Sequence, residues 1–221
     1  MSGKEARVKF AKSPSEVARR LAISEAVATV RRMGNALRND YYISPDEYLT
    51  GEELSVDKHE YLNGVVYMMA GASAGHDRIT MNISRHLGNQ FSGKPCEAFS
   101  ADTRVHVRTE TAEFYYYPDV TVDCTGRAND SRYSESPRVI FEVLSPATER
   151  VDRGEKLQNY QRLASLEAYV LVDQARVAVT VYRKTAAGWE SELLLEKGDV
   201  LALGCIECQL PLTAIYERTG L

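Results

Sequence analysis

An acidic residue interrupts an apolar strand pattern near the middle of the chain. Residues 138–145 read RVIFEVLS and are followed by Pro146, and Glu142 stands between β-branched, aromatic and aliphatic neighbours. Such a run is typical of a strand that is buried on both faces of a sheet. An ionised carboxylate there costs several kcal/mol unless another group pairs with it. Glu142 therefore either belongs to a buried ion pair or serves a chemical role.

A second acidic residue, Asp119, follows Pro118 in the segment YYYPDVTVDC. Proline suits the start or the edge of a strand. Val120 and Val122 then form one face of the predicted strand, and Asp119 lies on the other. Taken alone, Asp119 fits a turn or cap role better than a catalytic one.

A lysine on the next predicted helix completes the set. In DRGEKLQNYQRLAS, a spacing of ~100° per residue places Lys156 along the apolar face that also carries Tyr160 and Leu163. The side chain could extend past its neighbours to solvent, or it could be the counter-ion of Glu142. It could also be a cation held over a site lined by carboxylates.

A buried aspartate, a buried glutamate and a lysine are the groups used for metal-dependent hydrolysis of phosphodiesters. Carboxylates hold Mg²⁺, and the metal polarises the phosphate and lowers the pKa of a water molecule. A lysine stabilises the charge that develops on the phosphate, or it orients the nucleophile. The three residues therefore suggest a nuclease.

The elements that must position these residues alternate between strands and helices, which predicts an α/β or α+β fold with a mixed sheet. Asn63-Gly64, between two short apolar runs, is a strong hairpin signal. Helices are expected at residues 45–50, where Ser44 is the cap, at 77–91 and at 152–165. Strands are expected at 96–100, 103–108, 115–124, 138–145, 169–172, 177–183 and 189–195.

The charge is unevenly distributed along the chain. Residues 1–40 hold nine Lys and Arg against four Asp and Glu, whereas the remaining 181 residues hold 18 against 27. An acidic body argues against avid binding to a polyanion without metal. We therefore expect a basic helical extension at residues 1–40 and a nuclease-like domain at residues 41–221.

The extension contains SPSEVARRLAIS…TVRR, which is similar to the start of excisionase-type helix-turn-helix domains. Ser13 and Glu16 form a capping-box pattern, with Pro14 at the first helical position. A plain helical arm or an oligomer contact is the favoured alternative to DNA reading by this segment.

No secretory or membrane segment is expected. The N-terminus lacks an apolar core for a secretory signal, and no apolar run reaches the ~20 residues that cross a bilayer. The four cysteines do not indicate a disulfide scaffold. A cytoplasmic protein with reduced thiols is the expectation.

Several segments in order resemble the Uma-type family of restriction-endonuclease-like proteins, within the PD-(D/E)XK nuclease superfamily. They are HEYLNGVVYMMAG, the region around His76, YYYPDVTV, IFEVLSPATE, DRGEKLQNY and EAYVLVDQ, and the resemblance runs from about Ile43 to Tyr182.

This resemblance implies a mixed β-sheet core flanked by helices, with additional antiparallel strands. It also implies that Asp119 and Glu142 bind Mg²⁺, or Mn²⁺, and that Val143 offers its backbone carbonyl. The lysine of the superfamily stands two residues after the glutamate, where this chain has Leu144, and Lys156 is the residue that matches in the Uma-type family. Glu60 matches an upstream acidic residue, although an ordinary exposed strand position is an equally good interpretation.

Other residues give weaker signals. His76 fits helix entry or packing better than catalysis, and Asp102 fits a turn as well as a site. Cys205 and Cys208 form one CxxC without a second pair, whereas a structural zinc needs four ligands.

The favoured interpretation is a homodimeric DNA endonuclease, because cutting two strands favours two sites related by two-fold symmetry. The alternatives are a non-catalytic nucleic-acid-binding or regulatory protein on the same fold, and a structural protein in which Glu142 and Lys156 form only a buried ion pair.

Overall fold

The computed structural model describes residues 42–221, which form two compact units. Among the described residues, the first unit holds 42–59 and 64–69, and the second holds 60–63 and 70–221. The predicted basic extension with its helix-turn-helix-like segment lies outside the described residues, so the proposed boundary near residue 40 stays a prediction.

The first unit is built around helix α2 (Pro45–Leu54) and strand β2 (Val65–Met68). Ser44 caps the helix as predicted: its hydroxyl accepts from the Glu47 backbone N–H, and the Glu47 carboxylate accepts from the Ser44 N–H. This reciprocal pair satisfies two backbone donors that a helix start leaves open. The Tyr48 hydroxyl donates to the His59 carbonyl at 2.6 Å and fastens the helix within the unit.

The Asn63-Gly64 signal is confirmed as a turn between β1 (His59–Leu62) and β2. Asn63 has φ 45° and Gly64 has φ 101°, which is the left-handed backbone that a type I′ turn requires. A Cβ at Gly64 would stand 2.3 Å from the Tyr42 ring, so glycine is required there for space as well as for conformation.

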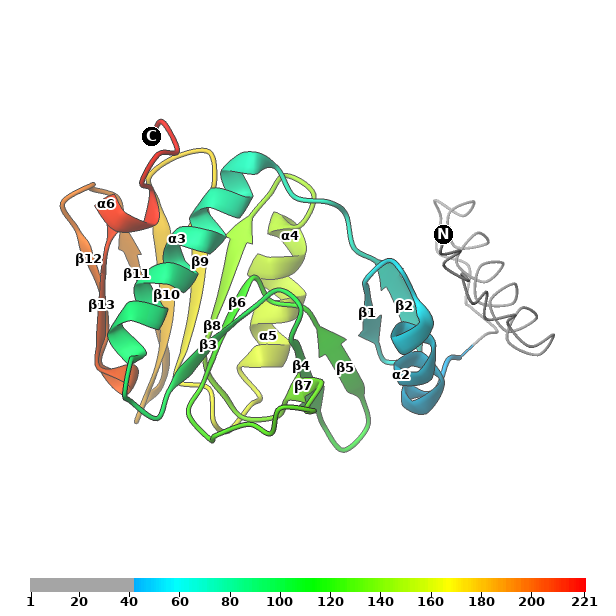
Figure 1. Ribbon diagram of the computed structural model, residues 1–221. Helices are drawn as coiled ribbons and strands as arrows, with labels where there is room; N and C mark the ends of the chain where they lie inside the picture. The colour runs from blue at the N-terminus through cyan, green and yellow to red at the C-terminus, as the bar shows by residue number, and fades with distance from the viewer. Residues whose placement is uncertain (1–41) are drawn as a thin grey trace, which may run out of the picture. The chain divides into compact units, whose positions relative to one another are not determined.

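The second unit is organised around a six-stranded sheet in the order β11-β10-β9-β8-β6-β3 (Figure 1). Strands β8 and β9 pair in parallel and their neighbours pair antiparallel, so the mixed sheet expected from the sequence is confirmed. The strands are β3 (Glu97–Ser100), β6 (Val120–Asp123), β8 (Pro137–Leu144), β9 (Ala168–Asp173), β10 (Val179–Thr185) and β11 (Gly188–Leu194).

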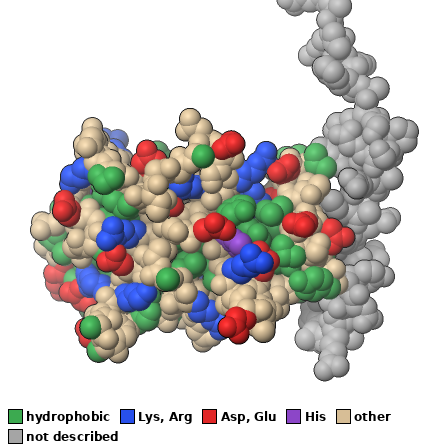
Figure 2. All heavy atoms as spheres, turned by 90° about the horizontal axis from the view of Figure 1, so that it is seen from below, with side chains coloured by type: hydrophobic (Ala, Val, Ile, Leu, Met, Phe, Trp, Pro, Cys, Tyr) green, Lys and Arg blue, Asp and Glu red, His purple; other side chains and the backbone are tan. Residues whose placement is uncertain are grey.

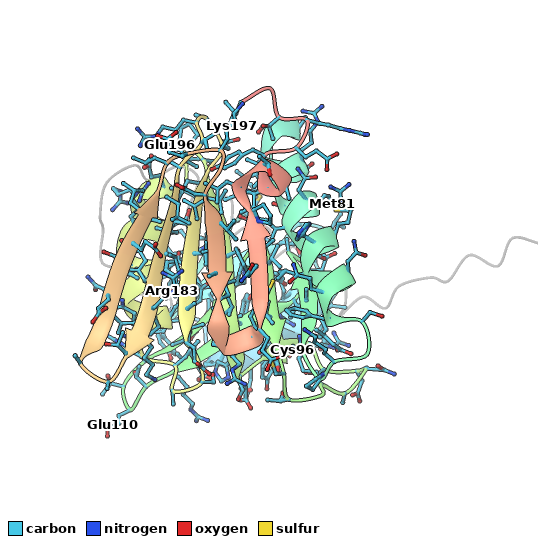
Figure 3. All side chains as sticks on the ribbon, turned by 90° about the vertical axis from the view of Figure 1, so that its left-hand side faces the viewer. Met81, Cys96, Glu110, Arg183, Glu196 and Lys197 are labelled. Atoms are coloured by element: carbon cyan, nitrogen blue, oxygen red, sulfur yellow. A yellow bond between two sulfur atoms is a disulfide. The ribbon has the colours of Figure 1, made fainter. Side chains whose placement is uncertain are left out.

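Both faces of this sheet are covered. Helix α3 (Ala74–Phe91) lies across one face, where the ribbon β12 (Val200–Leu203) and β13 (Cys208–Pro211) and helix α6 (Leu212–Ile215) continue the same core (Figures 1 and 3). The helical segment 149–160 packs on the other face. Within residues 42–221, no helix is both long and apolar enough to cross a membrane.

A smaller sheet of the second unit contributes to the second core. Its order is β1-β5-β4-β7, with antiparallel pairs except for β4 and β7. Val105, Val107 and Tyr116 from this sheet pack against the helical segment and the main sheet. The remaining strands are β4 (Arg104–Arg108), β5 (Glu113–Tyr116) and β7 (Tyr133–Ser134).

Two predicted elements differ in the structure. The single strand expected at 115–124 is two strands, β5 and β6, because the chain breaks at Pro118-Asp119 and passes from the small sheet to the main one. The helix expected at 152–165 begins at Glu149 and ends at Tyr160. It consists of α4 (Glu149–Val151), a π-helical segment η1 (Asp152–Lys156) and α5 (Leu157–Tyr160).

The expectation of reduced thiols is wrong for two of the four cysteines. Cys96 and Cys124 form a disulfide, and their Cα atoms are 3.9 Å apart. The cause is strand register: Glu97 pairs with Asp123 between the antiparallel strands β3 and β6, so Cys96, just before Glu97, and Cys124, just after Asp123, come opposite each other. Cys205 and Cys208 remain free thiols.

Candidate active site

The candidate site lies where strands β6 and β8 separate. Their antiparallel pairing ends at Val120 and Phe141, one residue before Asp119 and Glu142 would face each other. The edge of β8 beyond Phe141 therefore has no strand partner on the β6 side, and backbone groups there are open to side chains. Pro118, which lacks an N–H, accounts for the end of the ladder at this point.

Asp119 occupies this opening. Its Oδ2 atom accepts a 2.7 Å hydrogen bond from the Val143 N–H. Because a strand residue of an antiparallel pair directs its N–H and its C=O to the same side, the Val143 carbonyl also points toward the opening. The Nε2 atom of His76 lies 3.2 Å from the same Asp119 oxygen.

Glu142 faces the opposite side of the sheet from Val143. Alternation along β8 sends Val139, Phe141 and Val143 into the α3 core, and Ile140 and Leu144 into the second core. The Glu142 side chain shares that second face and is almost fully buried. It accepts from Lys156 Nζ at 3.1 Å and from the Tyr160 hydroxyl at 3.2 Å.

Lys156 is the centre of a carboxylate cluster. Its Nζ atom lies 2.9 Å from Glu60 Oε1, 3.1 Å from Glu142 Oε1 and 3.4 Å from Asp152 Oδ1. The Glu60 carboxylate also accepts from the Tyr117 N–H at 3.1 Å, which anchors it to the short connection between β5 and β6 that contains Asp119. The lysine side chain is 6% exposed, so these contacts are shielded from water.

The π-helical segment positions Lys156. A π-helix replaces i→i+4 bonds by i→i+5 bonds and is frequent at functional sites. Here both of its buried residues, Asp152 and Lys156, face the sheet. The Tyr169 hydroxyl donates to the Asp152 carbonyl at 3.0 Å and holds this turn against β9.

A tyrosine shell surrounds the cluster on the same face. Tyr116 lies beneath the lysine, with Nζ 5.7 Å from the ring centroid, and its hydroxyl donates to Glu155 at 3.0 Å. The Asn159 amide donates to the Tyr116 oxygen at 2.6 Å. The ring of Tyr160 contacts the rings of Tyr116 and Tyr169, and all three side chains are fully buried.

Burial and excess negative charge shift the titration of the cluster. Burial raises the pKa of Glu142 well above its ordinary value; the Lys156 charge opposes this, and the charges of Asp152, Asp119 and Glu60 add to it. Burial also raises the pKa of Asp152, against the effect of Lys156. For Lys156, burial acts to lower the pKa, but the surrounding carboxylates outweigh it and raise the pKa well above its ordinary value.

His76 is under similarly opposed influences. Burial acts to lower its pKa, but the hydrogen bond and the charge of Asp119 outweigh burial, so the pKa is raised. The ring also interacts with the Val143 backbone, while its Nδ1 atom is buried and has no partner within residues 42–221. The sequence pattern favoured helix entry for His76; the structure places it at the helix start and also against Asp119.

The donor set fits a hard divalent cation. Asp119, Glu142 and the Val143 carbonyl supply oxygen atoms, which Mg²⁺ and Mn²⁺ prefer. The carboxylates of Asp119, Glu60, Glu142 and Asp152 outnumber Lys156 and His76, which leaves negative charge for a cation to neutralise. No three His, Cys, Asp or Glu side chains in the described part of the chain already form a metal-binding group. Lys156 contacts Glu142, and His76 contacts Asp119.

The predicted site residues lie on neighbouring parts of the fold. Lys156 contacts both Glu142 and Glu60, and Asp119 accepts from the backbone N–H of Val143, the residue after Glu142. Asp152 was missed, although its spacing of four residues from Lys156 was a readable signal for a shared helix face. Asp102 is exposed in the turn between β3 and β4.

Comparisons with known proteins agree with this architecture. Residues 25–213 match the Uma2 family model, which is described as "Putative restriction endonuclease". Two uncharacterized proteins of Synechocystis are similar: one is 34% identical over 79% of this chain and 92% of its own length, and the other is 35% identical over 62% and 78%. The crystal structure of a "putative nuclease belonging to DUF820" from Anabaena variabilis superposes with a TM-score of 0.65 at 16% identity, covering 80% of this chain and 99% of that one.

Proposed function

The chain belongs to the Uma2 family of restriction-endonuclease-like proteins, and from this premise we propose that it is a homodimeric, metal-dependent endonuclease that hydrolyses phosphodiester bonds of DNA. The observation that carries the proposal is the buried Lys156 ammonium beside Glu142, next to the opening in which Asp119 binds the Val143 backbone. A structural ion pair needs one carboxylate, whereas this lysine contacts three.

Each residue of the site has a role that follows from its position. Asp119, Glu142 and the Val143 carbonyl would hold Mg²⁺ or Mn²⁺, which when bound polarises the phosphate and lowers the pKa of a water molecule. Lys156 supplies a positive charge for the negative charge that develops on the phosphate. Glu60 and Asp152 hold the ammonium in place, and Glu60, the more exposed of the two, can also orient water.

The placement of Lys156 accounts for Leu144. A lysine two residues after Glu142 would point to the same face of the sheet, because side chains alternate along a strand. In this chain the position is filled by a buried leucine, and the helix that packs on that face supplies the ammonium instead. The ammonium group therefore reaches the same face of the sheet from the helical segment and not from β8.

The surface charge is consistent with dependence on a cation. Residues 41–221 carry nine more acidic than basic side chains, and acidic and basic groups are interspersed over the face shown in Figure 2. Such a surface offers little attraction for a polyanion by itself. A bound divalent cation supplies part of the missing charge.

The test uses the full-length protein with supercoiled plasmid, linear duplex, single-stranded DNA and RNA, each with Mg²⁺, Mn²⁺ or EDTA. We expect metal-dependent nicking or cutting of DNA that Asp119→Ala and Glu142→Gln abolish, while Glu110→Ala, at an exposed loop position, leaves it intact. Circular dichroism checks that the variants fold. If the protein binds nucleic acid but cuts none of these substrates, it is instead a non-catalytic nucleic-acid-binding protein. Light scattering measures the molar mass and so tests for the dimer.

A further inference from the structure

His76 lies on the first turn of α3 and is held there from two directions. The Ser73 hydroxyl accepts from the His76 N–H at 3.2 Å and donates to Gln174 Oε1 at 2.7 Å, so the helix start is tied to the loop after β9. The His76 ring is thereby directed at Asp119 Oδ2, 3.2 Å from Nε2, and at the Val143 backbone. These are two of the groups proposed above to hold the cation.

Both ring nitrogens of His76 have defined surroundings. The side chain is 13% exposed, and its Nδ1 atom is buried and has no hydrogen-bond partner among residues 42–221. Nε2, the other ring nitrogen, is the atom that lies against Asp119. A neutral imidazole is the commonest metal ligand in proteins and can bind through either of its nitrogens.

The distance between the two atoms also fits a shared cation. Two donors at about 2.1 Å from one octahedral cation, in adjacent positions, stand about 3.0 Å apart. The observed separation of 3.2 Å between His76 Nε2 and Asp119 Oδ2 is close to that value. Little movement of either side chain is needed for both to bind one ion.

We propose that His76 is a further ligand of the divalent cation through Nε2, together with Asp119 and the Val143 carbonyl, and that this nitrogen shifts the preference of the site from Mg²⁺ toward Mn²⁺ and Co²⁺. The inference rests on the proposed function, because it concerns the same site. Oxygen-only sites suit Mg²⁺, whereas imidazole favours the transition metals, whose affinity for nitrogen donors rises from Mn²⁺ to Co²⁺.

The experiment measures Mn²⁺ binding to the full-length protein and the electron spin echo modulation of the bound ion. We expect ¹⁴N modulation from a directly bound imidazole in the wild type. His76→Gln should remove the modulation and weaken Mn²⁺ binding by about tenfold or more, with a smaller loss for Mg²⁺. His86→Gln, which changes a histidine farther along the same helix, should leave both signals unchanged.

The outcomes separate this inference from the proposed function. In one outcome, Mn²⁺ binds the wild type in a way that depends on Asp119, but the wild type shows no nitrogen modulation and His76→Gln binds Mn²⁺ with the same affinity. That result overturns the role of His76 and leaves the nuclease proposal standing. A wild type that neither binds Mn²⁺ nor cuts DNA overturns both. The wild-type spectrum decides the point even where a His76 variant does not fold.

Discussion

Lys156 reaches Glu142 from a helix and not from the strand that carries the glutamate: Nζ lies 3.1 Å from Oε1 across a separation of 14 residues. Two further carboxylates, from Glu60 and Asp152, contact the same ammonium. The cluster thus has more negative than positive charge in a buried place, which is unfavourable for folding and useful for binding a cation.

Replacing Lys156 by methionine should reduce both activity and stability. The variant leaves three carboxylates without their cation, so we expect a loss of about 3–5 kcal/mol in the free energy of unfolding. The cleavage rate should fall by about 10²–10³-fold. Urea unfolding and plasmid cleavage measure the two effects, and Lys197→Met, at an exposed position, is the control. Unchanged stability would show that the lysine is not paired as described.

Replacing Glu142 by glutamine should have opposite effects on activity and stability. Glutamine keeps the volume and an oxygen that accepts from Lys156 and Tyr160, and it removes one surplus charge. We expect the free energy of unfolding to rise by about 1 kcal/mol, because replacing a functional residue that is unfavourable for folding often stabilises a protein. Cleavage should be lost. The exposed Glu196→Gln serves as the comparison, and a destabilised Glu142→Gln protein would favour a purely structural ion pair.

The stability gain in Glu142→Gln should depend on pH. The folded-state pKa of Glu142 is raised above its ordinary value of 4.5, so the folded protein keeps a proton that the unfolded chain releases. Its contribution to stability is therefore fully present below pH 4.5 and is lost as the pH rises through the folded-state pKa. Urea unfolding of the metal-free proteins at several pH values should show the variant gaining on the wild type as the pH rises. A constant difference would contradict the shift.

The disulfide makes a separate prediction about stability. Cys96 and Cys124 close a loop of 28 residues, for which chain entropy gives a stabilisation of about 3–4 kcal/mol. Cys96→Ser should lower the free energy of unfolding by a similar amount, and Cys205→Ser should have little effect. Peptide mapping without reduction should find Cys96 joined to Cys124 and both remaining cysteines alkylated; alkylation of all four would refute the pairing.

Much of the architecture could be predicted from local patterns. The periodicity of apolar residues locates β8 and α3, the Asn63-Gly64 pair locates the turn, and the helical face of Lys156 directs it inward. These features depend on residues close in the sequence, whose spacing reflects one element at a time. The fold class followed from the alternation of such elements.

What could not be predicted depends on where separate elements meet. The break at Pro118 sends β5 and β6 to different sheets, and only the sheet order shows that β6 then ends beside Glu142. The contact of His76 with Asp119 requires α3 to start at that same point. The Cys96–Cys124 bond follows from the register of β3 and β6, which no local pattern records.

The π-helical segment has a consequence for how this family can vary. Lys156 is its last residue, and each residue in a helix advances the direction of the following side chains by about 100°. Loss of one residue, such as Gly154, would let the segment relax to an ordinary α-helix and turn the ammonium away from Glu142. An insertion or deletion within η1 would therefore inactivate the site even though every one of its residues remained present in the sequence.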